Sequence, residues 1–148
     1  MSDFEVLTAA ARPYLAVVRT QAAREGLPVG KFDLIDDSYE SPAAPETEGW
    51  IDLDQEAVAR RYGPKVVDLT IFWDSLTGWN VYAERLGGED IHWWMGAGLV
   101  PAPERVTAFI ATVLLLDYTM TGSEERPFYR RAGEEVPALV ERLRHYGS

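Results

Sequence analysis

The chain has 148 residues, of which 47% are hydrophobic and 26% charged, a composition typical of a single soluble domain over residues 1–148. The formal net charge of −10 argues against direct nucleic-acid binding, because a phosphate backbone requires a basic face. The sequence contains no cysteine, which excludes disulfides and thiolate metal sites, and its apolar runs are shorter than the roughly 20 residues of a membrane span. We therefore expect neither nucleic acid nor a membrane among its partners.

The N-terminal segment is predicted to form a helix. Ser2 and Glu5 give a capping-box pattern, and apolar residues then recur at helical spacing as far as Ala22. Pro13 must either kink this helix or start its second half, and Gly26 is expected to end it. Two acidic residues stand where a signal peptide would carry positive charge, so we expect a cytoplasmic protein.

Two short strands and a helix are expected next. Residues 29–37 and residues 50–53 read as strands, and the proline-containing stretch between them reads as a loop. Asp54 is a good N-cap for a brief helix that ends at Tyr62, before a Gly-Pro pair.

The negative charge is concentrated in a loop-rich acidic segment, residues 33–56. This segment holds nine carboxylates and neither lysine nor arginine, so the rest of the chain is close to neutral. Such a segment would attract a basic protein partner over a long range, whereas the simpler interpretation is a solvated loop that keeps the protein soluble. Its acidic residues are Asp33, Asp36, Asp37, Glu40, Glu46, Glu48, Asp52, Asp54 and Glu56.

Residues 66–103 hold four of the five tryptophans and most of the strand-forming residues. Three strands are predicted there, at residues 66–73, 79–84 and 91–95, and a turn joins the first two. Alternation places one set of their side chains on a core face. These are Val67, Leu69, Ile71, Trp73, Trp79, Val81, Ala83, Ile91, Trp93 and Met95.

The opposite face of these strands combines aromatic rings with polar groups such as Asp68, Thr70 and Asn80. Large rings seldom face solvent in such number, so we expect something to cover them. Another element of the same chain could pack there, or the face binds a partner or ligand. The candidate binding residues on this face are Phe72, Tyr82, His92 and Trp94.

Two helices are predicted after the sheet. Pro103 occupies the favoured first turn of one helix, and the other runs to about Tyr146 within a C-terminal helical extension, residues 118–148. The whole pattern predicts an α+β fold. We expect a mainly antiparallel sheet of four to five strands, packed by an N-terminal helix and two C-terminal helices.

Three motifs resemble a known kind of domain. Trp73-Asp74 and Gly78-Trp79 frame the predicted hairpin, the run from Gly96 to Pro103 leads into the following helix, and Arg12-Pro-Tyr-Leu opens the first helix proper. Together they resemble an uncharacterised domain of unknown function found in actinobacterial proteins, notably those of streptomycetes. The resemblance implies a Trp-Asp, turn, Gly-Trp hairpin followed by Val-Pro-x-Pro and a helix. It implies no activity, because that family has no catalytic residues to carry over.

The residues favour a protein-interaction or regulatory module rather than an enzyme, and two copies of the chain could associate through the same face. No nucleophile elbow, phosphate loop or metal-ligand spacing occurs, and a zinc site would need both histidines, His92 and His145, together with carboxylates from distant segments. We therefore expect no catalytic residues, no metal and no cofactor. Two alternatives stay open: a small-ligand sensor with a tryptophan-lined pocket, and an enzyme in which Asp74, Glu89 or Asp90 orients His92.

Overall fold

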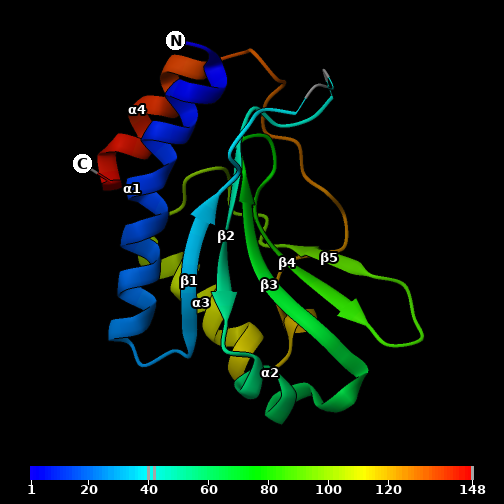
Figure 1. Cartoon of the computed structure of the whole chain (residues 1–148). Coiled ribbons are helices and arrows are strands. Elements are labelled where there is room, and N and C mark those ends of the chain that lie inside the picture. The colour runs from blue at the N-terminus through cyan, green and yellow to red at the C-terminus, as the bar shows by residue number, and fades with distance from the viewer. Residues whose placement is uncertain (40, 42, 148) are drawn as a thin grey trace.

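The computed structural model of the chain describes residues 1–39, 41 and 43–147. Its described residues form four α-helices and an antiparallel sheet of five strands, which confirms the predicted α+β class (Figure 1). The strands lie in chain order, β1 (Val29–Leu34), β2 (Glu48–Leu53), β3 (Val66–Asp74), β4 (Gly78–Arg85) and β5 (Ile91–Trp94). The helices are α1 (Asp3–Arg24), α2 (Gln55–Tyr62), α3 (Pro103–Leu115) and α4 (Val136–Gly147).

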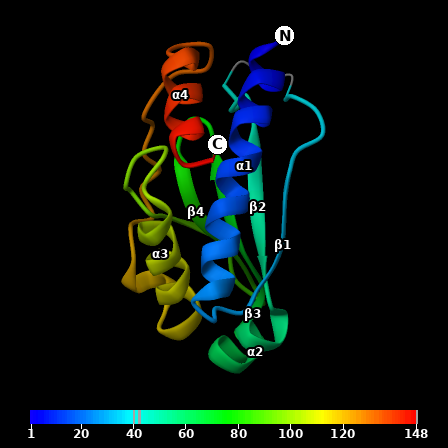
Figure 2. The same cartoon turned by 90° about the vertical axis from the view of Figure 1, so that its left-hand side faces the viewer.

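Helices α1, α3 and α4 lie on one face of the sheet, as the view in Figure 2 shows. Helix α2 packs at the lower end of the sheet, against β3 and α3 (Figure 1). Within the described residues, the opposite face of the sheet carries no helix. None of these described helices combines the length and the apolar run that a bilayer span would need.

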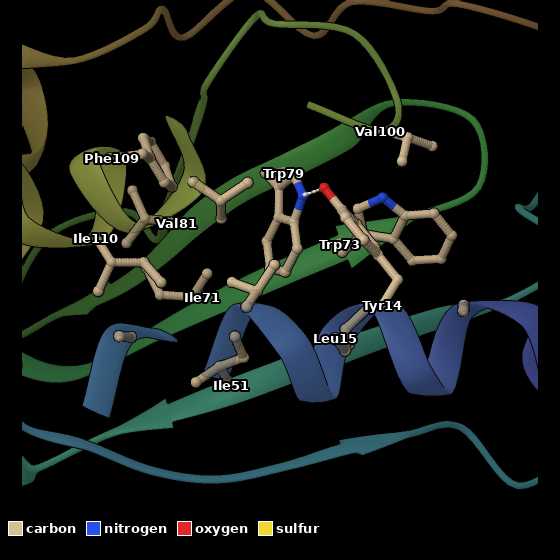
Figure 3. Packing of buried hydrophobic residues seen from close by; sticks show 14 of the residues in the cluster. Tyr14, Leu15, Ile51, Ile71, Trp73, Trp79, Val81, Val100, Phe109 and Ile110 are labelled. Carbon is tan, nitrogen blue, oxygen red and sulfur yellow. Dashed lines mark hydrogen bonds between the residues drawn. The ribbon is translucent and has the colours of Figure 1, made fainter. Parts of the chain in front are cut away.

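The core lies between the sheet and helices α1, α3 and α4, and Trp73, Trp79 and Tyr14 are its largest fully buried side chains (Figure 3). The Tyr14 hydroxyl donates to the Pro101 carbonyl at 2.6 Å and accepts from Trp79 Nε1 at 3.1 Å. The Trp73 indole donates to the Leu99 carbonyl at 2.8 Å. Because buried polar atoms require partners, these bonds fix α1 and the strands to the loop that precedes α3.

The turn between β3 and β4 explains one of the glycines in the motifs, Gly78. Gly78 has a φ of +77°, a left-handed conformation that favours glycine. A Cβ atom at this position would lie 2.6 Å from the carbonyl oxygen of Gly98. The Gly-Trp pair is therefore needed for close backbone packing between the hairpin turn and the loop after β5.

Three expectations about the strands need correction. Strand β1 ends at Leu34 rather than at residue 37, and β2 begins at Glu48 rather than at residue 50, because Glu48 pairs with Asp74 at the end of β3. Val67 is 53% exposed rather than in the core. A shift in the register between Val66 and residue 68 changes the alternation there, and Val66 packs against the core instead.

Helix α1 is one continuous helix that contains Pro13 in its interior. It begins with the expected capping box of Ser2 and Glu5. The C-terminal end of α4 packs against the middle of α1. A Cβ atom at Gly147 would lie 2.6 Å from the backbone nitrogen of Tyr14. Helix α4 therefore ends in direct backbone contact with α1.

Candidate functional site

A pocket of about 380 Å³ lies on the face of the sheet that the helices leave open. All four candidate binding residues predicted from alternation line it, together with side chains that come from β2, β3, β4 and the segment before α4. Their binding role stays a prediction. The lining residues are Glu48, Phe72, Asp74, Asn80, Tyr82, His92, Trp94 and Arg126.

Aromatic rings form a continuous row across this face, from β2 to β5. The Trp50 and Phe72 ring centroids are 6.4 Å apart, and Phe72 is 6.2 Å from Tyr82 in an edge-to-face arrangement. His92 follows at 5.1 Å from Tyr82 and stacks on Trp94 at 5.3 Å. Each contact lies within the distance at which aromatic rings attract one another, so the row is held in place by its own members.

A buried amide lies beneath the rings. Asn80 is 3% exposed, and its Oδ1 atom is 2.9 Å from His92 Nδ1. Partial burial lowers the pKa of His92, and the nearby Arg126 guanidinium adds to this effect. The lowered pKa favours the neutral imidazole, and because an amide oxygen can only accept, Nδ1 is the donor in this hydrogen bond.

Two of the three carboxylates proposed as partners of His92, Asp74 and Asp90, accept hydrogen bonds from other groups. Asp90 accepts a hydrogen bond of 2.6 Å from the Tyr82 hydroxyl, which raises the pKa of Tyr82 to about 12. Asp74 accepts from the backbone amides of Leu76 and Thr77, at 2.8 and 2.7 Å. The hydrogen bond to His92 is made by Asn80 in the described structure, instead of by Asp74, Glu89 or Asp90.

Two carboxylates stand side by side in the pocket wall. Glu48 and Asp74 are directly opposite each other in the register of β2 and β3, and Asp74 is 7% exposed. Burial raises the pKa of Glu48, and the negative charge of Asp74 raises it further. The Tyr39 hydroxyl donates to Glu48 at 2.6 Å, and Arg126 approaches Asp74 to 4.0 Å. The pocket wall thus holds two carboxyl groups beside one guanidinium.

Arg126 belongs to the connection between η2 (Tyr118–Met120) and α4, which runs along the β5 side of the sheet (Figure 1). On one side of Arg126 the connection is fixed by a bridge in which Trp94 and Ser123 exchange backbone hydrogen bonds of 2.7 and 2.9 Å. On the other side it is fixed by Arg130, whose guanidinium is buried. The arginine at the pocket thus lies between two anchors.

The second anchor is a buried ion pair between Arg130 and Glu46. Their closest atoms are 2.6 Å apart, and the two side chains are 2% and 8% exposed. Arg130 donates from both terminal nitrogens, and Ser75 and the Gly133 amide add two further bonds to the carboxylate. Burial alone would raise the pKa of Glu46, but these donors outweigh it and lower the pKa to about 2.

The carboxylates of the acidic segment lie in several different environments. Glu46 is in the buried ion pair, Glu48 is in the pocket, and Asp54 caps α2 by accepting from the amide of residue 56. Asp33 lies 3.4 Å from Arg12 in an exposed pair. Four further carboxylates are exposed, and Glu40 lies outside the described residues; the four are Asp36, Asp37, Asp52 and Glu56.

Sequence reasoning missed part of the pocket. Alternation already places Asn80 on this face, although not among the candidate binding residues, and it also places Trp50, a member of the aromatic row outside the pocket lining, on the same face as Phe72. Arg126 gave no signal, since it lies in a polar connection without periodicity. Across residues 1–39, 41 and 43–147, no three histidine or carboxylate side chains are arranged to hold a metal ion.

The fold and the site define an α+β domain with an aromatic, acidic pocket on the open face of an antiparallel sheet. The sequence profile of a family of unknown function, DUF6292, matches residues 14–112, which is more than half of the chain. The chain belongs to this family, and the expected resemblance to an uncharacterised domain is confirmed. No curated protein and no solved structure matches the chain. The match contains the rings and both pocket carboxylates, whereas Arg126 and Arg130 lie beyond it.

Proposed function

We propose that the chain is a non-enzymatic protein-interaction module that binds a partner protein on the open face of its sheet. The observation that carries this proposal is the row of aromatic rings around the pocket, which the described helices leave uncovered. Rings of this size each offer a large apolar area. Four of the five rings in the row are half-buried, and the area that they still expose is available to an associating partner.

The composition of this face supports a protein partner. Tyrosine, tryptophan and arginine are enriched at the energetic centres of interfaces, and Tyr82, Trp94 and Arg126 all line the pocket. The exposed carboxylates at Asp36, Asp37 and other positions of the acidic segment favour a partner with a basic surface. A cytoplasmic location and self-association stay predictions of the sequence.

A second candidate function is a small-ligand sensor. The pocket volume of about 380 Å³ falls within the range of about 300–1,000 Å³ that is usual for small-molecule sites. A shift in tryptophan emission on addition of one metabolite, saturable and lost in Trp94→Ala, would favour this function over a protein partner.

To test the interaction proposal, a partner is first captured with the tagged chain and identified. The partner is then purified, and its affinity for the purified chain is measured. Trp94→Ala and Tyr82→Ala should each weaken binding at least about tenfold, which corresponds to about 1.4 kcal/mol at an interface centre. Val67→Ala is the matched control, because Val67 is an exposed apolar residue outside the pocket. Binding that both pocket variants leave intact would refute the proposal, and light scattering separates a partner from a second copy of the chain.

A further inference from the structure

We infer that the pocket takes up one basic side chain, lysine or arginine, of the partner protein. This inference rests on the proposed function and adds to it the chemistry of the group that the pocket recognises. It is carried by three features of the pocket, namely paired carboxylates, aromatic rings and a free amide, and by the arginine that already lines it.

The first feature is the pair formed by Glu48 and Asp74. Like charges directly opposite each other on neighbouring strands destabilise a sheet, and here both carboxylates are partly or largely buried. Among the described residues, Arg126 is the one cation in the pocket lining, and its closest approach to Asp74 is 4.0 Å. Glu48 has a neutral tyrosine hydroxyl as its side-chain partner. The pair therefore has room for a second positive charge.

The second feature is the aromatic surround. Phe72, Tyr82 and Trp94 line the same pocket as the two carboxylates. The face of an aromatic ring attracts a cation, and it also packs against the alkyl part of a lysine or arginine side chain. Rings and carboxylates together select a positively charged group that carries an apolar stem.

The third feature is the Asn80 amide. Its Oδ1 atom is engaged by His92, and no described residue bonds its Nδ2 atom, although the side chain is 3% exposed. As Asn80 lines the pocket, this amide is available to donate to a carbonyl oxygen. A peptide segment supplies a backbone carbonyl beside its basic side chain, which a simple amine does not.

Arg126 shows that a guanidinium fits at this position. Its side chain is 41% exposed, and its guanidinium also lies 4.7 Å above the Phe128 ring. The long distance to Asp74 and the exposed position make it a loosely held occupant. An incoming basic side chain shares the pocket with the like-charged Arg126, so the affinity of the pocket depends on this arginine.

The test is a titration of the isotopically labelled chain with three short peptides, followed by the NMR signals of the tryptophan indoles and of Asn80. The peptides are acetyl-Gly-Lys-Gly-amide, its arginine counterpart and its Nε-acetyl-lysine counterpart. We expect saturable shifts with lysine and arginine peptides and at least about fivefold weaker binding of the neutral peptide.

Two variants and a control sharpen the result. Glu48→Gln should weaken binding of the lysine peptide about fivefold, and Arg126→Gln should strengthen it by a similar factor. Asp52→Asn is the control, because Asp52 is an exposed carboxylate on the same face of β2 but outside the pocket lining. It should change the affinity less than twofold, on the order of a remote screened charge.

Equal binding of the neutral and charged peptides would overturn the inference, as would weaker binding in Arg126→Gln or the absence of any shift up to about 10 mM peptide. Each of these results leaves the protein-interaction proposal standing, because that proposal is judged by the effect of Trp94→Ala on the reconstituted complex. A partner whose binding is weakened by Trp94→Ala but unchanged by Glu48→Gln would support the interaction proposal and overturn the inference about the basic side chain.

Discussion

Replacing Glu46 with glutamine removes one half of the buried ion pair that fixes the connection before α4, and we expect it to destabilise the protein by about 3 kcal/mol. The lowering of the Glu46 pKa from 4.5 to about 2 supplies this magnitude, at about 1.4 kcal/mol for each pH unit. Breaking a buried pair by removing one partner costs about 3–5 kcal/mol in general, since the remaining charge stays buried. Both arguments give the same size of effect.

The assay is urea unfolding followed by tryptophan fluorescence, for the wild type and Glu46→Gln. The folded-state pKa is depressed, so the stabilisation is fully present above pH 4.5 and is lost as the pH falls towards 2. The difference in unfolding free energy should stay constant between about pH 7 and pH 5 and become smaller below that range.

The exposed pair between Arg12 and Asp33 is the matched control. Its atoms are 3.4 Å apart and its side chains are 51% and 56% exposed, so Asp33→Asn should cost less than about 1 kcal/mol. If Glu46→Gln cost no more than Asp33→Asn, or if its effect did not change with pH, the assignment of a stabilising buried pair would be wrong.

Three further substitutions test the packing and the pocket. Tyr14→Phe leaves a buried indole and a buried carbonyl without their partner and should lower the unfolding free energy by about 2 kcal/mol, measured in urea. Gly78→Ala should lower the unfolding free energy by about 3 kcal/mol and the melting temperature far more than Gly87→Ala does. Gly87 also has a positive φ, but a Cβ atom there would meet no other atom within 4 Å. Equal losses in the two variants would contradict the close-contact argument. Glu48→Gln should stabilise the protein by about 0.5 kcal/mol at pH 7, whereas Asp52→Asn should not. Because the folded-state pKa of Glu48 is raised, this gain should vanish as the pH falls and the wild-type carboxyl becomes protonated, and a loss at pH 7 would count against the like-charge pair.

The faces of the sheet could be predicted because alternation is a local property of a strand. Leu69, Ile71 and Trp73 are buried as expected, and the rings on the other face meet in one pocket. The exception is Val67, where a bulge changes the phase of the pattern. A bulge depends on how two strands meet, and sequence alternation within one strand does not contain that information.

The ion pair and the pocket arginine could not be predicted from the sequence. Glu46 and Arg130 are separated by 84 positions, and both lie in segments without hydrophobic periodicity. The sequence therefore groups Glu46 with eight other acids in one charged segment, although its side chain is 8% exposed in the structure. Long-range pairing of polar residues depends on the fold already formed, which a single sequence does not reveal.

Arg126 reaches the pocket from a part of the chain that the family match does not include, whereas the rings and the two carboxylates belong to the matched part. The pocket is therefore built from two parts of the chain, the sheet inside the matched range and the connection beyond it. Under the proposed function, a substitution at Arg126 is expected to change the charge of the binding surface and to leave the core intact, because this side chain is 41% exposed.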